Sequence, residues 1–328
     1  MVLVLSSTEV RAALPMREAI RSIEEGFRAL GAGRAFVPKR LVVPVEEFGG
    51  SLLCMPAYIT DQEALAVKAV SVYPRNQEMG RPTVSAVAIL LDPRTGEPLA
   101  MIEGGSLTAI RTGAAAGIAT KRLAVDGARK VGVFGAGAVG RAAVEAVKEV
   151  LGDPVVKVYD VVRARAERCA REISRNLEIS ASVASDPRDA ASGADVIVTA
   201  TTSEAPVFDG RCLESGAHVN AMGSHSPDAR EIDTATLLRA RGRIVLDSKE
   251  ACMAEAGDIL IPMAEGAIRE SDIFGELGEI IAKGKAVRRS DRDVTLFKSV
   301  GVAVQDAAAA AAVYKVAKAA GIGREIRL

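Results

Sequence analysis

The chain has 328 residues, with 42 lysines and arginines against 42 aspartates and glutamates. Its formal net charge is zero, so neither nucleic-acid binding nor membrane attachment is expected. No stretch approaches the roughly 18 uninterrupted apolar residues of a membrane span, and the opening MVLVLSSTEVRAAL lacks the basic start of a signal peptide. These features predict a cytoplasmic protein with two domains of ordinary size.

The first third of the chain is predicted to begin with helices. A capped helix start is expected at Ser7, and a second helix is expected from Met16 to Leu30, where Gly31 and Gly33 follow. Short apolar runs then predict strands with no helix between them, which indicates an antiparallel or mixed sheet. The predicted strands lie within 35–43, 51–58, 64–73, 84–91 and 98–103, and DPRTGE makes a hairpin-type loop between the last two.

An alanine-rich helix is predicted over 106–124, and the pattern changes after Gly127. Short apolar strands now alternate with helical segments, which is typical of a doubly wound parallel sheet. A second alanine-rich helix near the end could complete this sheet domain or return to the first domain. The strands are predicted within 130–137, 155–160, 194–201, 218–223 and 243–247, and two of the helices at 140–151 and 163–174.

The stretch VGVFGAGAVG joins a predicted strand to a predicted helix through a G-x-G-x-x-G turn. Gly135 permits the tight turn, Gly137 lets the backbone approach a pyrophosphate, and Gly140 allows close packing of helix on sheet. A nicotinamide dinucleotide is the predicted ligand, with a flavin or a degenerate turn as the alternatives.

An acidic residue ends the next predicted strand. Asp160 is spaced to bond the adenosine ribose, which favours NAD(H). Arg163 on the same loop could accept the 2′-phosphate of NADP(H), or could be a solvated residue at a helix start. Either dinucleotide is therefore expected, with NAD slightly favoured.

The two histidines form no H-x-x-x-H motif, and no catalytic metal is predicted. His218 lies in the buried-strand pattern AHVNAM and is expected to be a structural core residue. The four cysteines have no C-x-x-C spacing, so reduced thiols are expected. They are Cys54, Cys169, Cys212 and Cys252.

Several motifs together resemble the ornithine cyclodeaminase/mu-crystallin family, which also contains archaeal-type alanine dehydrogenases and cyclic ketimine reductases. They are VPKR (37–40), MPAY (55–58), AVKAV (66–70), RPTVSA (81–86) and LTAIRTGAA (107–115), then VTATTSEAPVF, VNAMGSHSPDAREID and KSVGVAVQDAAAA.

The resemblance implies an α/β protein with a Rossmann-type doubly wound nucleotide domain and an α+β domain for substrate binding and dimerisation. The expected bounds are 1–125 for the second of these, rejoined by a C-terminal helix at 303–328, and 126–302 for the nucleotide domain. A homodimer acting on a small amino-acid-derived substrate is also implied.

Residue roles are implied in the same way. Arg40 and Arg111 would hold a substrate carboxylate, and Lys68 would contact the reacting amine, imine or carbonyl. Alternatively, Arg111 is a surface residue and Lys68 a lysine at a strand end. The remaining implied contacts are Met55 and Thr83 with the substrate, and Thr201, Asn220, Met222, Ser299 and Gly301 with the cofactor.

The chain departs from the cyclodeaminases in one motif. Those enzymes resemble one another in G-x-D-x-P-G-K-x-E-L, and His225 stands here in place of the aspartate. An imidazole provides no fixed negative charge for an amine, so His225 is better suited to reduction of a preformed C=N bond. Asp228 could compensate, and His225 could instead be a loop residue that caps a turn.

Three functions remain open at this point. The first is NAD(P)H-dependent reduction of a cyclic ketimine, pyrroline-2-carboxylate or piperideine-2-carboxylate, to L-proline or L-pipecolate. The second is alanine dehydrogenase or ornithine cyclodeaminase. The third is a non-catalytic, cofactor-dependent binding protein, because a fold does not fix a function.

Overall fold

A computed structural model describes residues 1–327, which form two compact units. Unit 1 contains residues 1–111 and 302–328, and unit 2 contains residues 112–301. The division falls inside helix α3 (Gly104–Leu123), whereas the sequence placed the first domain boundary after residue 125. The last helix belongs to unit 1. This is the second of the two alternatives given for that helix, its return to the first domain.

Unit 1 is built on a mixed sheet in the order β16-β1-β7-β6-β5-β4-β2, with β3 also paired to β4. The β1–β7 pair is parallel and the other pairs are antiparallel. The strands are β1 (Val2–Leu5), β2 (Ala35–Phe36), β3 (Leu41–Val45), β4 (Gly50–Ile59), β5 (Ala64–Val72), β6 (Val84–Leu91), β7 (Pro98–Glu103) and β16 (Arg324–Ile326).

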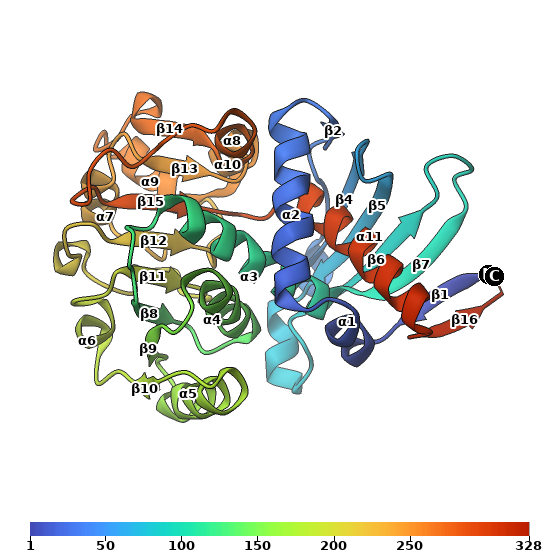
Figure 1. The fold of residues 1–328 in the computed structure, drawn as a ribbon, viewed down its shortest axis with the longest axis horizontal. Coiled ribbons are helices and arrows are strands. Elements are labelled where there is room, and N and C mark those ends of the chain that lie inside the picture. Colours follow the sequence, from blue (N-terminus) through green and yellow to red (C-terminus); the bar gives the residue numbers. More distant parts are fainter. Residues whose placement is uncertain (328) are drawn as a thin grey trace. The chain divides into compact units, whose positions relative to one another are not determined.

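Helices pack on this sheet, and its strands accordingly bury alternate residues. In β5 the buried positions are Ala64, Ala66 and Lys68, and helix α11 (Ala303–Ala320) packs against β4, β5 and β6. Helix α2 (Met16–Gly31) runs beside α11 (Figure 1). The short helix α1 (Ser7–Ala13) also contacts α11.

Two helix ends in unit 1 differ from the sequence prediction. The N-cap of α1 is Ser6, whose hydroxyl and backbone N–H both donate to Glu9, so the cap lies one residue before the predicted Ser7. The last helix ends at Ala320 and does not run to 328, because Gly321 adopts φ +65° and ends it. The chain then returns as β16, which pairs with β1.

Unit 2 is an entirely parallel sheet in the order β10-β9-β8-β11-β12-β15-β13-β14. Figure 1 shows the strands in this order from β10 to β14. They are β8 (Lys130–Phe134), β9 (Val155–Tyr159), β10 (Ala181–Val183), β11 (Val196–Thr199), β12 (His218–Ala221), β13 (Ile244–Leu246), β14 (Ile273–Glu276) and β15 (Thr295–Lys298).

The central strands of unit 2 are buried on both faces; every residue of β11, β12, β13 and β15 is buried. Such strands require helices on both faces of the sheet. The helices are α4 (Ala138–Leu151), α5 (Arg163–Leu177), α6 (Pro187–Ala191), α7 (Thr234–Arg239), α8 (Lys249–Glu255), α9 (Gly257–Ala264) and α10 (Leu277–Lys283). The predicted fold class, a doubly wound parallel sheet with a second α+β unit, is confirmed.

Candidate functional site

The glycine turn after β8 has the geometry of an anion-binding loop. Gly135 adopts φ +100°, and a Cβ there would lie 2.4 Å from the carbonyl oxygen of Ala200. A Cβ on Gly140 would lie 2.1 Å from the carbonyl oxygen of Gly135. Gly137 is the N-cap of α4, no side chain caps the helix, and nothing lies within 4 Å of an added Cβ. The first turn of α4 therefore offers backbone N–H groups to a pyrophosphate.

Asp160 follows β9 and is bonded to this turn. One carboxylate oxygen accepts the backbone N–H of Ala136 at 2.9 Å, and the other accepts that of Val162 at 2.9 Å. Each carboxylate oxygen has a second lone-pair site, so a ribose hydroxyl could still donate to it. Arg163 pairs with Glu167 at 3.1 Å on the exposed face of α5.

Three further predicted cofactor segments follow adjacent strands of the same sheet. Thr201 comes after β11, Met222 after β12, and Ser299 with Gly301 after β15. The carboxyl ends of parallel strands meet at one edge, where ligands of such sheets bind. The structure thus brings these residues to the edge that also carries the glycine turn.

An acid that the sequence did not single out organises the loop after β15. Asp247 is fully buried, and one of its oxygens accepts from the Ser299 hydroxyl at 2.6 Å and from the Gly301 N–H at 2.8 Å. The Val300 N–H donates to the same oxygen at 3.1 Å. Asp247 therefore fixes the conformation of the loop that was predicted to lie against the nicotinamide.

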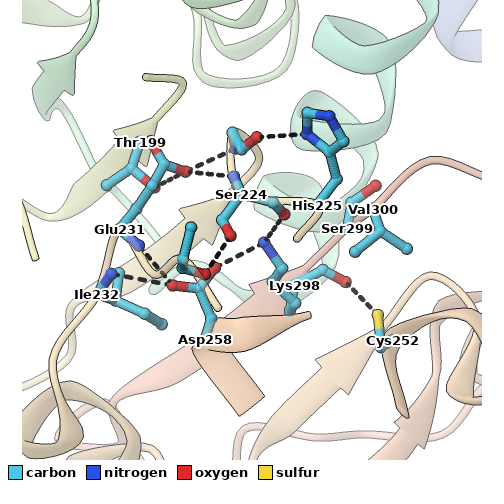
Figure 2. Close-up of polar contacts among 12 residues, drawn as sticks. Thr199, Ser224, His225, Glu231, Ile232, Cys252, Asp258, Lys298, Ser299 and Val300 are labelled. Carbon is cyan, nitrogen blue, oxygen red and sulfur yellow. Dashed lines mark hydrogen bonds and ion pairs between the residues drawn. The ribbon is translucent and has the colours of Figure 1, made fainter. Parts of the chain in front are cut away.

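A buried ionic network joins three segments at this edge (Figure 2). Lys298 is fully buried, and its ammonium lies 2.6 Å from Asp258 and donates to the Ser224 carbonyl at 2.6 Å. The second oxygen of Asp258 accepts the backbone N–H groups of Glu231 and Ile232 at 2.7 and 3.1 Å. The network thus connects the ends of β12 and β15 to α9.

The Glu231 carboxylate accepts five hydrogen bonds from the end of β11 and from the loops after β11 and β12. The donors are the Thr201 N–H and hydroxyl, the Thr199 hydroxyl and the N–H groups of Gly223 and Ser224, at 2.6 to 3.2 Å. Burial raises the pKa of Glu231, while nearby Lys298 opposes that rise. Because every partner is a donor, the arrangement suits the ionised carboxylate.

His225 lies on the loop that this network holds. Its side chain is exposed, and its Nδ1 is 3.1 Å from the Gly223 carbonyl oxygen (Figure 2). Asp228, the residue that could compensate for the missing aspartate, is also exposed. The structure thus leaves the imidazole at the surface of unit 2, tethered to its own loop.

Asn220 and His218 lie inside the sheet. Asn220 is fully buried and its amide donates to the Thr120 hydroxyl at 3.0 Å, so its predicted cofactor contact stays a prediction. His218 is fully buried with Nδ1 3.0 Å from the Thr295 hydroxyl. Burial lowers the pKa of His218 to about 3. The expectation of a structural core histidine is confirmed.

In unit 1 the structure brings Lys68 and Arg111 together on one carboxylate. Lys68 Nζ lies 2.7 and 2.8 Å from the two oxygens of Asp306, and Arg111 Nε lies 3.0 Å from one of them. Arg111 also donates from Nη1 to Gln305 at 2.5 Å. The three charged side chains are 2–7% exposed. Neither residue is therefore a surface residue or an exposed strand end.

The charges in this cluster do not cancel. Two cations share one carboxylate, which leaves an excess positive charge in a buried environment. Burial lowers the pKa of Lys68 to about 8, an effect that Arg111 and Arg40 reinforce and Asp306 opposes. Burial disfavours ionisation of Asp306, yet Lys68 and Arg111 lower its pKa overall. The excess charge is suited to an anionic ligand such as a carboxylate.

The other predicted substrate residues lie at different distances from the cluster. Met55 is buried and pairs directly with Lys68 across the β4–β5 ladder. Arg40 is half-buried and close enough to Lys68 to lower its pKa. Thr83 precedes β6 and accepts from the Tyr73 N–H, whereas the β6 partner of Lys68 is Ala88. Thr83 thus lies just beyond one end of that strand pair, whereas Lys68 lies near its middle.

Residues 1–327 contain no candidate metal site and no candidate membrane span. No group of three or more His, Cys, Asp or Glu side chains there could hold a metal ion. Within the same residues, no helix is long and apolar enough to cross a membrane.

Comparison with known proteins identifies the family. Residues 1–321 match the model of the ornithine cyclodeaminase/mu-crystallin family. The chain belongs to this family. A Delta(1)-pyrroline-2-carboxylate reductase of Bacillus cereus is 38% identical over 324 residues, which is 99% of each chain.

Solved structures of this family share the whole fold. The Thermococcus litoralis Delta(1)-pyrroline-2-carboxylate reductase in complex with NADH and L-proline is 42% identical, with a TM-score of 0.95 over 99% of this chain and 100% of that one. An archaeal alanine dehydrogenase dimer with bound NAD is 35% identical, with a TM-score of 0.92 over 100% of this chain and 99% of that one. The family expected from the sequence motifs is thereby confirmed.

Proposed function

We propose that this protein reduces a cyclic ketimine that carries a carboxylate next to the C=N bond, with NADH or NADPH as the hydride source. Pyrroline-2-carboxylate would give L-proline, and piperideine-2-carboxylate would give L-pipecolate. The observation that carries the proposal is the buried cluster of Lys68, Arg111 and Asp306, which pairs a proton donor with a carboxylate-binding guanidinium. The pyrroline-2-carboxylate reductases among its relatives support the same substrate class.

Substrate binding would use the excess charge of the cluster. Arg111 donates from Nε to Asp306 and from Nη1 to Gln305. Its Nη2 group would then donate to the substrate carboxylate. Arg40 would provide the second contact. Fixing the carboxylate also fixes the adjacent C=N bond, and such positioning contributes much of the rate in reactions of this kind.

Lys68 would act as the general acid. When a nicotinamide dinucleotide is bound, it supplies hydride to the imine carbon. The C=N π electrons then move to nitrogen, and Lys68 Nζ donates a proton to that nitrogen. The products are a secondary amine and a neutral lysine, which regains its proton from solvent. A pKa of about 8 allows Lys68 to be protonated before the step and to release the proton readily.

The dinucleotide would bind at the carboxyl edge of the unit 2 sheet. Gly135, Gly137 and Gly140 would receive the pyrophosphate at the start of α4, and Asp160 would accept from the ribose. Thr201, Met222, Ser299 and Gly301 would contact the rest of the cofactor. NAD(H) is slightly favoured because a 2′-phosphate would approach the Asp160 carboxylate.

Alanine dehydrogenase is the second candidate, because an archaeal alanine dehydrogenase structure is 35% identical over the whole chain. Ornithine cyclisation is less favoured. His225 stands where the cyclodeaminase motif has an aspartate, and its exposed imidazole supplies no fixed negative charge for the side-chain amine of ornithine.

We also propose a homodimer formed through unit 1. Strand β3 is a sheet edge beyond β4, and apolar side chains near it are 45–70% exposed. An exposed apolar patch on a sheet edge is a typical protein interface. The exposed residues are Phe36, Leu41, Val42, Val43 and Phe48. The dimeric alanine dehydrogenase supports this assembly.

The four unpaired cysteines favour a reducing, cytoplasmic location.

One substrate panel tests the function. Pyrroline-2-carboxylate, piperideine-2-carboxylate, and pyruvate with ammonia are each incubated with NADH or NADPH, and ornithine is incubated with the oxidised cofactors. The nicotinamide absorbance and the amino-acid products are followed. We expect clear reduction of a cyclic imine and no proline from ornithine above background. Faster turnover of pyruvate with ammonia would select alanine dehydrogenase, and no turnover of any substrate would indicate a binding protein.

A further inference from the structure

The sequence motifs imply roles for Lys68 and Arg111 but none for Asp306, the acid that binds both. Asp306 lies in the first turn of α11 and is 2% exposed. Its carboxylate reaches Lys68 on β5 and Arg111 on α3 at the same time. One side chain therefore contacts both functional groups of the proposed substrate site.

We propose that Asp306 is the positioning residue of this site, which holds the Lys68 ammonium beside the Arg111 guanidinium so that one faces the substrate nitrogen while the other binds its carboxylate. The inference rests on the proposed function. It adds a residue that acts through its contacts with Lys68 and Arg111.

The geometry supports this assignment. Lys68 Nζ and Arg111 Nε bind the same oxygen of Asp306, so the two nitrogens are held close to each other. In a 2-carboxy imine, the nitrogen and the carboxylate are separated by a single carbon. A proton donor and a carboxylate-binding group must therefore be neighbours, and a shared acceptor is a direct way to keep them so.

The other groups around Lys68 do not provide this link. Thr108 on α3 is 3.5 Å from Lys68 Nζ and is uncharged. Arg111 on α3 and Arg40 ahead of β3 are cations, and both disfavour the protonated lysine. Met55, opposite on β4, has no charge. Among the residues that surround Lys68 in the described structure, Asp306 is the carboxylate that keeps the ammonium protonated.

A role limited to stability is a weaker explanation. Buried ion pairs rarely stabilise a fold more than apolar side chains of similar size would. This cluster also buries one more cation than anion, which costs stability unless an anionic ligand completes it. The arrangement therefore suits ligand binding and proton transfer better than folding alone.

The test is the pH profile of imine reduction in Asp306→Asn. The amide keeps the size of the side chain but removes its charge, so the pKa of Lys68 falls below its present value of about 8. The protonated lysine is the active form, and activity is lost as pH rises through that pKa. We expect kcat/KM to fall at least about tenfold and its basic limb to move about one pH unit or more toward acid.

Two controls separate this role from general damage. Asp61→Asn removes a half-exposed carboxylate of unit 1 that pairs with Arg34, and should leave both kcat/KM and the limb unchanged. Asp306→Glu keeps the charge but displaces it, so the basic limb should stay within about half a unit of the unmodified protein while kcat falls. Circular dichroism and thermal melting show which variants fold.

The outcomes distinguish the inference from the proposed function. A basic limb that does not move in Asp306→Asn, or full activity in Asp306→Glu, would overturn the positioning role while imine reduction stands. If the unmodified protein reduces no imine, the proposed function fails, and nitrogen NMR titration of Lys68 still tests the pairing. An unchanged Lys68 pKa in Asp306→Asn would then overturn the inference. Ionisation of the substrate is the same in assays of the unmodified protein and of Asp306→Asn, so it cannot cause a difference in the basic limb between the two.

Discussion

Replacement of Lys298 by methionine tests the ionic network at the nucleotide-binding edge. Methionine has a similar length and no charge, so the change leaves the Asp258 carboxylate buried beside an apolar side chain. Both charged side chains are 0% exposed and 2.6 Å apart. Removing one partner of a buried pair typically costs about 3–5 kcal/mol, because the other charge is left uncompensated.

The matched control is Lys249→Met in the same unit. Lys249 pairs with Glu270 at 2.5 Å, a shorter distance than in the buried pair, but the side chains are 48% and 59% exposed. Exposed pairs contribute about 0–1 kcal/mol. Burial, and not the length of the contact, should therefore decide which variant is destabilised.

Urea unfolding of both variants, followed by circular dichroism, measures the difference. We expect the Lys298→Met midpoint to fall well below that of the unmodified protein and the Lys249→Met midpoint to stay close to it. The Ser224 carbonyl also loses its donor, so binding of NADH, measured by calorimetry, should weaken in any Lys298→Met that remains folded. Equal unfolding free energies for the two variants would refute the reasoning.

Four other changes have defined outcomes. Gly137→Val should abolish NAD(H) and NADP(H) binding in a folded protein, because the side chain fills the space at the start of α4; unchanged affinity by calorimetry would disprove the turn assignment. Arg111→Leu should lower kcat/KM for a cyclic imine at least about tenfold, since it removes a charged hydrogen bond; a near-normal value would contradict the carboxylate role. His225→Asp should lower imine reduction without creating proline from ornithine, and product analysis of both substrates decides this. Burial lowers the pKa of His218 from 6.5 to about 3, so the unfolded chain binds a proton at this residue before the folded protein does, and stability is lost as pH falls from about 6.5 toward 3. His218→Asn should therefore make the unfolding free energy less dependent on pH in this range. An unaltered pH dependence would count against burial of the neutral ring.

The sequence predicted the strands of unit 1 well where alternation was regular. The 84–91 and 98–103 segments coincide with β6 and β7, and the hairpin between them is present. Shorter strands were missed. β1 has four residues, and β16 follows a helix whose alanine-rich pattern gives no sign of a return to the sheet. Their pairing is decided by tertiary contacts that a local pattern does not contain.

The site shows the same division between local and long-range information. The glycine turn lies within one strand–turn–helix segment and could be predicted from spacing alone. Asp306 could not, because its partners Lys68 and Arg111 are far away in sequence and the helix around it is rich in alanine. Lys298 and Asp258 meet for a similar reason. Lys298 ends β15, and Asp258 lies on α9, which follows β13. In the sheet β15 lies beside β13 although β14 comes between them in the chain, and the sequence does not reveal this order.

The return of α11 to unit 1 has a consequence for biosynthesis. The amino-terminal segment of this unit leaves the ribosome first, but the helix that carries Asp306 is made only after all of unit 2. The buried site around Lys68 therefore cannot form until the last segment of the chain has been made. A message truncated anywhere before codon 303 would yield a polypeptide whose Lys68 and Arg111 never receive their shared counter-ion.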